Sequence, residues 1–331
     1  MINIAKISLA RIQIIIRLFI QKGETMKITV FSKGVWPVLL TPFKSDCSID
    51  FSGFASLLEY YIAHRVSGLF AVCLSSEMFQ LSSKERLELA KFTVKQANSR
   101  VPVVACAGFG DTLQERIDSV KAMAETGVDA VVLPLGLIVS PDDSETVLEK
   151  TFDAILNATG DTVLGLYECP VPYHRLLSAD CLGRLAKNSG NRLSFLKDTC
   201  CNRAMLRAKL EAIRGTELKL YNANLPTYLY SLQHGAAGYS GTSANFYPEI
   251  LAELTETFQT QPERAQKIQD FLTLVQRHVD YKYPNSAKKF LSMRGVAIEA
   301  YTRMGWNTLN ADDLETLSVF DSALQDFVVR I

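Results

Sequence analysis

The chain has 331 residues, of which 48% are hydrophobic and 21% charged, and its 35 basic residues balance its 35 acidic ones. This composition is typical of a soluble globular protein with a sizeable core, and it excludes extensive disorder. A formal net charge of zero, without a long run of one sign, also argues against a nucleic-acid-binding surface. We therefore expect no nucleic-acid partner.

The first 25 residues differ in pattern from the rest. The segment from Ile7 to Ile20 is apolar, but it contains Arg11 and Arg17. A stretch of about 14 residues with two arginines is too short and too charged to span a bilayer, and it lacks the uninterrupted apolar run of a signal peptide. We expect no membrane partner and interpret residues 1–25 as an extension. Either translation begins at Met26, or the segment forms an amphipathic surface helix.

Short apolar runs alternate with segments of helical periodicity from residue 33 onward, which indicates a parallel α/β fold. Ser82 and Ser83, ahead of Lys84 and Glu85, form a plausible helix cap. The elements expected in chain order are strand 35–40, helix 51–64, strand 69–73, helix 83–98, strand 101–105, helix 113–126, strand 130–133, helix 144–157, strand 163–167, helix 179–188, and strands 193–196, 218–221 and 238–241.

Eight strands that alternate with helices predict a (β/α)₈ TIM barrel, which we place at residues 26–245. Helical periodicity continues over residues 246–331, so we expect a C-terminal helical appendage. In such barrels the active site lies at the C-terminal ends of the strands. The residues that close each apolar run are therefore the first candidates for function.

Lys197 follows the apolar run 193–196, so its amine should emerge at the rim of the barrel. Desolvation there lowers the pKa of a lysine, and a neutral amine can attack a carbonyl carbon. Tyr167 closes the preceding strand, about 5 Å away in a sheet, and a phenol can pass protons to the reacting oxygens. The alternatives are a lysine that reaches solvent, a tyrosine that only packs, or a nucleophile elsewhere, such as Lys219.

Several motifs in this order resemble the dihydrodipicolinate synthase and N-acetylneuraminate lyase family across roughly residues 33 to 300. The resemblance implies a 2-oxo acid bound as an imine to Lys197, with Tyr167 as the proton shuttle. It also implies no cofactor and no metal, and a homotetramer or homodimer. The motifs are Gly34 to Phe43, Leu74 to Glu77 with Leu81, Gly108 to Thr112, Leu166 to Pro170, Lys197-Asp198, and Gly235 to Gly238.

The resemblance also implies a binding site for the carboxylate of the 2-oxo acid. Ser75 matches a hydroxyl residue of the family motif that holds this carboxylate, and Ser76 follows it. Ser240 falls where the eighth strand of the family touches the bound acid through its backbone. Thr41, which closes the first strand, is a further candidate at the same mouth.

Four positions depart from the synthase branch of the family. Leu74 replaces a hydroxyl residue, and Gly136 stands where that branch has a tyrosine. Gly110 matches a tyrosine that some members send to a neighbouring subunit, and Pro172 replaces the arginine that binds the second substrate. The proton relay of the synthase branch is therefore absent, and we expect a remodelled substrate end.

The segment 168–175 follows the fifth strand and contains two prolines, which restrict its backbone. It could present Tyr173, His174 or Arg175 to a ligand at the substrate end of the barrel. The alternative is a rigid surface loop. Glu168 is a weaker candidate for a base.

The seven cysteines have no paired metal-ligand spacing, and we interpret them as reduced thiols of a cytoplasmic protein. Those at or just past strand ends either ring the mouth or simply pack there; they are Cys73, Cys106, Cys169 and Cys200.

We therefore predict a Schiff-base-forming lyase, aldolase or dehydratase that acts on pyruvate or a 2-keto-3-deoxy sugar acid. One alternative is a catalytically weak barrel that binds a 2-oxo acid and acts as a sensor or assembly partner. Another is dihydrodipicolinate synthase itself, which the four changed positions disfavour.

Overall fold

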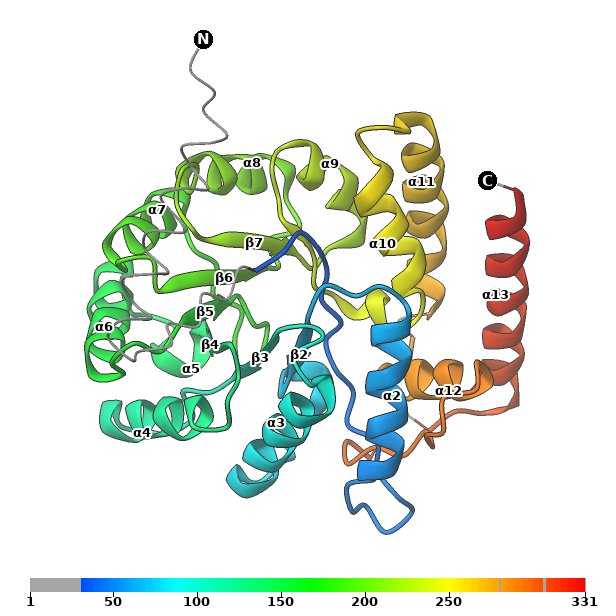
Figure 1. Ribbon diagram of the computed structural model, residues 1–331, viewed down its shortest axis with the longest axis horizontal. Coiled ribbons are helices and arrows are strands. Elements are labelled where there is room, and N and C mark those ends of the chain that lie inside the picture. The colour runs from blue at the N-terminus through cyan, green and yellow to red at the C-terminus, as the bar shows by residue number, and fades with distance from the viewer. Residues whose placement is uncertain (1–30, 280, 306–307, 331) are drawn as a thin grey trace, which may run out of the picture. The chain divides into compact units, whose positions relative to one another are not determined.

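The computed structural model describes residues 31–279, 281–305 and 308–330 (Figure 1). The interpretation of residues 1–25, including a start at Met26, lies outside the described residues. Residues from Phe31 onward form one compact unit. None of the helices in this described part is long and apolar enough to cross a membrane.

Eight parallel strands form one sheet in the order β1-β8-β7-β6-β5-β4-β3-β2. All neighbouring pairs in this order are parallel, and the expected (β/α)₈ barrel is confirmed. The strands are β1 (Gly34–Val35), β2 (Leu69–Ala71), β3 (Val103–Cys106), β4 (Ala130–Pro134), β5 (Leu164–Tyr167), β6 (Leu193–Asp198), β7 (Lys219–Asn222) and β8 (Gly238–Tyr239).

The first strand is shorter than expected, because the chain leaves regular pairing at Pro37, which has no N–H to donate. The contact to β2 resumes at a single parallel bridge between Val38 and Phe70. Leu39 N donates to Phe70 O at 2.9 Å, and Phe70 N donates to Pro37 O at 3.0 Å. These bonds join the two ends of the sheet and close the barrel.

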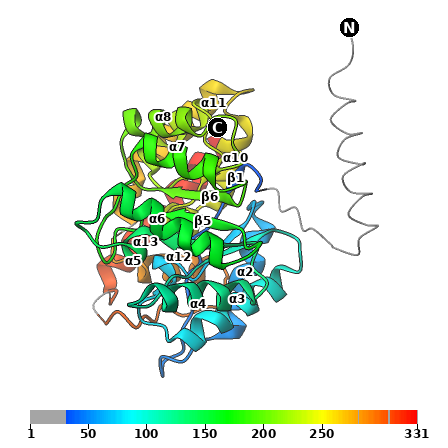
Figure 2. The same cartoon turned by 90° about the vertical axis from the view of Figure 1, so that its left-hand side faces the viewer.

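Helices surround the sheet, and Figure 2 shows α6, α7 and α8 covering one side of it. The cap predicted for α3 is present, with Ser82 and Glu85 bonded reciprocally, and Thr112 and Glu115 form the same arrangement at the start of α4. The barrel helices are α2 (Phe51–Ala63), α3 (Ser83–Ala97), α4 (Leu113–Ala124), α5 (Leu135–Ile138), α6 (Glu145–Ala158), α7 (Ala179–Asn188), α8 (Arg203–Ala212) and α9 (Tyr228–Gln233).

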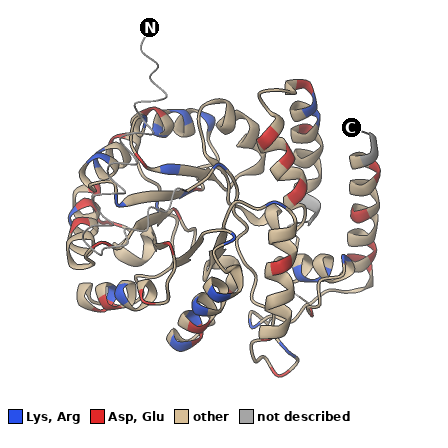
Figure 3. Ribbon diagram, viewed as in Figure 1, with Lys and Arg blue, Asp and Glu red and all other residues tan. Residues whose placement is uncertain are grey.

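The C-terminal helices expected after residue 245 are present and gather on the right in Figure 1. They are α10 (Pro248–Thr257), α11 (Pro262–Val279), α12 (Asn285–Met293) and α13 (Ala311–Arg330). Lysines, arginines and acidic residues are interspersed over the helices of the whole unit (Figure 3). Short 3₁₀ turns also follow three of the strands: η1 (Leu74–Ser76), η2 (Leu225–Thr227) and η3 (Thr242–Asn245).

An aromatic cluster fills part of the barrel interior. Phe195 lies at its centre, with its ring 5.4 Å from Trp36, 4.7 Å from Tyr221 and 5.6 Å from Phe70 between centroids. These side chains are fully buried. Phe195 precedes Lys197 by two residues on β6, so it lies on the same face of the strand, one layer deeper. The cluster therefore forms an apolar floor below the candidate lysine.

Candidate active site

Tyr167 and Lys197 are direct partners in the register of β5 and β6, so both side chains lie on the inner face of the barrel. The Nζ atom of Lys197 lies 4.3 Å from the centroid of the Tyr167 ring and 5.6 Å from that of Phe70. The lysine is only 5% exposed. The structure therefore brings the two predicted catalytic residues together at the ends of their strands.

Burial lowers the pKa of Lys197, because desolvation disfavours its ammonium form. Within the described residues, no carboxylate lies within ion-pair distance of its Nζ to offset this effect. Burial also raises the pKa of Tyr167 well above its ordinary value, so the phenol stays protonated. A less basic amine beside a protonated phenol suits carbonyl attack assisted by proton transfer.

Lys219, the alternative nucleophile, occupies a different level of the barrel. It begins β7 and pairs in register with Phe195, two residues before Lys197 on β6. It therefore lies nearer the N-terminal end of the sheet, away from the strand ends where barrel active sites form.

Three of the cysteines that the sequence places at strand ends interact electrostatically with Lys197, namely Cys73, Cys106 and Cys169. All three are buried and free. Burial raises the pKa of Cys106 and Cys169, so these thiols are neutral. Cys200 instead directs its sulfur toward Asn202 O at 3.6 Å. Cys106 and Cys169 therefore pack near the amine without adding charge.

Two of the four predicted hydroxyl residues have their hydroxyl groups bonded to the backbone. Ser76 Oγ donates to Leu39 O at 2.6 Å and accepts from Cys73 N at 3.1 Å. Thr41 Oγ1 donates to Ser76 O at 2.7 Å. These bonds hold the turn after β2 against the end of the first strand, so both side chains shape the turn.

Ser75 and Ser240 differ from that pair. Ser75 lies in the 3₁₀ turn after β2 and is 6% exposed. Ser240 follows β8, and its backbone N–H donates to Asn222 O at 2.9 Å. Its buried Oγ has no hydrogen-bond partner among the described residues. A buried hydroxyl of this kind can accept or donate to a bound ligand.

The C-terminal appendage reaches the turn after β2. Lys288 on α12 forms a buried ion pair with Glu77 at 2.7 Å and donates to Tyr301 O at 2.6 Å. The second carboxylate oxygen of Glu77 accepts from Thr302 Oγ1 and Arg303 N at 2.7 and 2.8 Å. Helix α12 and the segment that follows it therefore hold Glu77, two residues after Ser75.

The segment 168–175 is bonded to its neighbours. Tyr173 donates its hydroxyl to Val139 O, and Arg175 donates to Pro141 O at 3.2 Å. A Cβ atom added to Gly136 would lie 3.1 Å from Tyr173 O and 3.3 Å from Pro172 Cδ. The segment thus fills the space beside Gly136. Gly136 and Pro172, two of the four departures from the synthase branch, therefore lie next to each other.

Of the three candidate ligand contacts in this segment, His174 is the exposed one, and its Nε2 lies 2.7 Å from Thr199 Oγ1. The structure does not support Glu168 as a base in the barrel. Its carboxylate accepts from Leu177 N at 2.9 Å and Thr199 N at 3.1 Å and pairs with Lys209. Because side chains alternate along a strand, Glu168 faces away from Tyr167.

Lys209 on α8 was missed in the sequence reasoning. It lies between Leu206 and Leu210 on a helix whose buried residues are these three. A lysine within an apolar helix stripe requires a buried partner, and that is the signal that could have found it.

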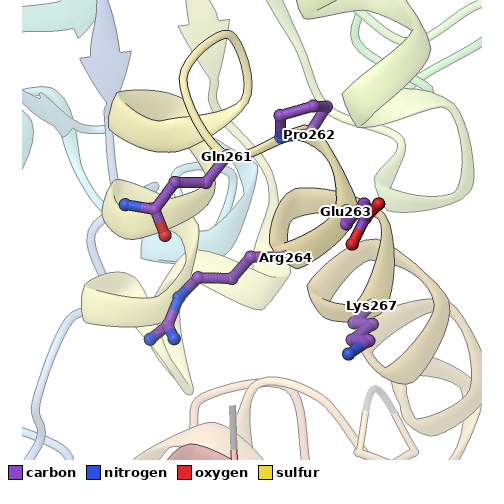
Figure 4. A pocket seen from close by; sticks show the side chains of 5 residues that line it. All are labelled: Gln261, Pro262, Glu263, Arg264 and Lys267. Carbon is purple, nitrogen blue, oxygen red and sulfur yellow. The ribbon is translucent and has the colours of Figure 1, made fainter.

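A surface hollow lies at the start of α11 (Figure 4). It contains none of the strand-end residues, and its lining is Gln261, Pro262, Glu263, Arg264 and Lys267. Within residues 31–279, 281–305 and 308–330, no group of three or more His, Cys, Asp or Glu side chains is arranged to hold a metal ion.

A closed parallel barrel with a buried lysine and tyrosine side by side at its strand ends defines a (β/α)₈ protein of the class I aldolase type. A sequence profile of the Dihydrodipicolinate synthetase family matches residues 31–323. The chain belongs to this family, whose members are lyases of that type.

Individual relatives agree with this assignment. The 4-hydroxy-tetrahydrodipicolinate synthase of Gluconacetobacter diazotrophicus is 28% identical over 254 residues, which cover 76% of this chain and 82% of the relative. A monomeric dihydrodipicolinate synthase variant superposes with a TM-score of 0.80 at 18% identity, covering 88% of this chain and 97% of that one. An E. coli K12 prophage protein of the same family, in complex with pyruvate, gives 0.79 at 22%, covering 89% and 98%. The two structures support the fold.

Proposed function

We propose that Lys197 forms an imine with a 2-oxo acid, pyruvate or a 2-keto-3-deoxy sugar acid, and that the protein cleaves or forms a bond next to that imine. The observation that carries this proposal is the pairing of Tyr167 and Lys197 on the inner face of the barrel, above an apolar floor. The family membership and the low exposure of both side chains support it.

The cleavage direction can be written step by step. The neutral amine of Lys197 attacks the C2 carbonyl, and loss of water, with Tyr167 supplying a proton to the departing oxygen, leaves an iminium ion. Tyr167, deprotonated in that step, then takes the C4 hydroxyl proton while the C3–C4 bond breaks, and the electron pair of that bond flows into the iminium to form an enamine. Protonation of the enamine at C3 and hydrolysis release pyruvate and the free lysine.

We propose that Ser75 and Ser240 contact the bound 2-oxo acid and that Ser76 and Thr41 support them. The hydrogen bonds of Ser76 and Thr41 within the turn after β2 favour this division. Orientation of the carboxylate by this turn would direct the carbonyl carbon toward the lysine.

Borohydride reduction in the presence of pyruvate tests the proposed imine. We expect a mass increase on the peptide that carries Lys197, absent in Lys197→Ala and retained in Lys219→Ala. An unmodified Lys197 in folded wild-type protein would contradict the proposal and favour the alternative of a catalytically weak binding barrel. Release of pyruvate from a panel of 2-keto-3-deoxy sugar acids would then identify the second product.

Dihydrodipicolinate synthase activity is the second candidate, because two of the relatives named above carry a synthase name of this kind. The replacements at Leu74, Gly110, Gly136 and Pro172 count against it. Formation of 4-hydroxy-tetrahydrodipicolinate, measured beside the sugar-acid panel, separates the two.

We further propose a cytoplasmic homotetramer or homodimer, with residues 26–245 as the catalytic barrel and 246–331 as its appendage. The free state of all seven cysteines supports the location, and the family resemblance supports the assembly. Light scattering of the purified protein measures the number of subunits.

A further inference from the structure

A buried cluster of three charged side chains lies behind the candidate catalytic pair. Lys209 Nζ contacts a carboxylate oxygen of Glu168 and lies 2.7 Å from Asp198 Oδ2. All three side chains are 0% exposed. Burial by itself favours the neutral amine of Lys209, but the two carboxylates outweigh this effect and raise its pKa. The ammonium ion is therefore held between the acidic side chains of Glu168 and Asp198.

The position of this cluster follows from the alternation of side chains along a strand. Glu168 directly follows Tyr167 on the chain, and Asp198 directly follows Lys197. Their side chains point to the outer face of the sheet, where α8 supplies Lys209. One ammonium group thus bridges the ends of the two strands that carry the catalytic pair.

Backbone donors complete the cluster. Thr199 N donates to Glu168 at 3.1 Å, and Thr199 Oγ1 donates to Glu168 O at 2.6 Å. Cys200 N donates to Asp198 Oδ1 at 3.1 Å. The loop after β6 is therefore bonded to the same two carboxylates as Lys209. The cluster joins β5, β6, this loop and α8 in one hydrogen-bonded unit.

Stability alone is a weak explanation for such a unit. Desolvation of buried charges offsets much of their mutual attraction, and well-packed apolar residues are often as stable in their place. A bridge between two strand ends does, however, limit their relative movement. Imine formation is sensitive to such movement, because a displacement of about 1 Å can slow a reaction by two orders of magnitude.

We propose that Lys209 is a positioning residue that holds the ends of β5 and β6 together and so sets Tyr167 relative to Lys197 for imine formation. This inference rests on the proposed function. It adds a residue that touches neither the substrate nor the reacting atoms and acts through Glu168 and Asp198.

The test compares two cations that each bridge two carboxylates. Lys209→Met removes the bridge behind the catalytic pair. Arg294→Met removes a matched bridge in the C-terminal helices, where Arg294 pairs with Glu249 at 2.7 Å and Asp321 at 3.0 Å. For each protein, borohydride trapping of pyruvate on Lys197 is followed at pH 8, where Glu168 is ionised, over a range of pyruvate concentrations. This yields a maximal trapping rate and a half-saturating concentration.

We expect Lys209→Met to lower the maximal trapping rate on the order of 10- to 100-fold, with little change in the half-saturating concentration. Arg294→Met should leave both quantities unchanged even where it lowers the melting temperature. A folded Lys209→Met protein that traps pyruvate at the wild-type rate would overturn the inference and leave the proposed function intact. Wild-type protein that traps no pyruvate would instead overturn both.

If Lys209→Met does not fold, Glu168→Gln provides the second variant. It keeps the size of the side chain and an acceptor oxygen for Leu177 N, but it weakens the link to β5. We expect a severalfold lower maximal trapping rate at an unchanged half-saturating concentration. A wild-type rate in folded Glu168→Gln would also overturn the inference.

Discussion

Two buried lysines, Lys197 on β6 and Lys209 on α8, lie on the inner and outer sides of the same sheet and have opposite electrostatic environments. Lys197 faces the apolar interior of the barrel without a carboxylate partner in the described structure, and burial lowers its pKa. Lys209 faces the outside of the sheet between Glu168 and Asp198, and its pKa is raised. Burial of both lysines thus produces a candidate nucleophile in one place and a charged bridge in the other. The difference lies in the partners, because desolvation disfavours a charge only where nothing compensates it.

Replacing Lys197 with arginine should have the largest effect. The change places a permanent positive charge on the inner face of the sheet, like the charge that Lys209 carries on the outer face. A guanidinium stays protonated at every accessible pH and cannot attack a carbonyl. We expect no borohydride-dependent adduct on the peptide that contains residue 197, as measured by mass spectrometry. Lys219→Arg serves as the control and should trap pyruvate like wild type. Adduct formation in Lys197→Arg would place the nucleophile elsewhere.

Tyr167→Phe should have the next largest effect. Proton transfer by a positioned side chain typically contributes about 10²- to 10⁴-fold, so the trapping rate should fall by at least about 100-fold. The fold should persist, because the ring and its edge contact with Phe70 remain. The matched control is Tyr221→Phe, which loses a hydroxyl that donates to Ser32 O on the same barrel. Similar rates for both variants would contradict the shuttle.

The pH dependence of unfolding distinguishes the outer cluster from other carboxylates. Burial, with a further contribution from Asp198, raises the pKa of Glu168 from 4.5 to about 7 against the opposing charge of Lys209. The unfolded chain releases this proton near pH 4.5 while the folded protein keeps it. The stability contributed by this group is therefore present below pH 4.5 and lost as the pH rises through 7.

Denaturant unfolding of wild type and Glu168→Gln at pH 5 and pH 8 measures this loss. We expect the free energy of unfolding of the variant to change less between the two pH values. Hydrogen bonds from arginines lower the pKa values of Glu59 and Glu85 to about 2. The stability that these two groups contribute changes only below pH 4.5, so they should not alter the comparison between pH 5 and pH 8 in either protein. An unchanged pH dependence in Glu168→Gln would show that Glu168 is ionised throughout this range.

Ser240→Ala should have the smallest effect. It tests whether the Ser240 hydroxyl, on the inner face of the sheet, contacts the bound ligand. Its Oγ is buried without a partner in the described structure, whereas the carboxylates of the outer cluster are all hydrogen-bonded. Removing an unsatisfied polar group should stabilise the protein by about 1 kcal/mol. We expect the half-saturating pyruvate concentration to rise severalfold in the trapping assay. A destabilised variant with unchanged pyruvate binding would contradict a ligand role.

Local signals were enough to predict much of the fold. The alternation of apolar runs and helical periodicity predicted eight strands and the start of α4, and the expected cap at Ser82 and Ser83 marked the start of α3. The extent of the first strand was wrong, because the missing N–H of Pro37 and the pairing with Phe70 decide it. The short helix α5 was not expected, since its four residues are too few to show a helical period.

The candidate site was predictable only in part. Strand-end position and the family motifs selected Lys197 and Tyr167, and the structure places them side by side. The hydrogen bonds of Ser76 and Thr41 join residues 37 and 35 positions apart, and sequence spacing carries no information about such contacts.

The sequence by itself determined the fold class, because strand and helix periodicity and the positions that close each strand are local properties of the chain, and its motifs carried the resemblance to the lyase family. It also determined which lysine ends an apolar strand. Only the tertiary structure decided which buried lysine stands without a carboxylate and which is charged. That outcome depends on Glu168, Asp198 and Lys209 meeting across elements up to 41 residues apart. Electrostatic energy depends on distance in space, and the order of residues in the chain does not specify it.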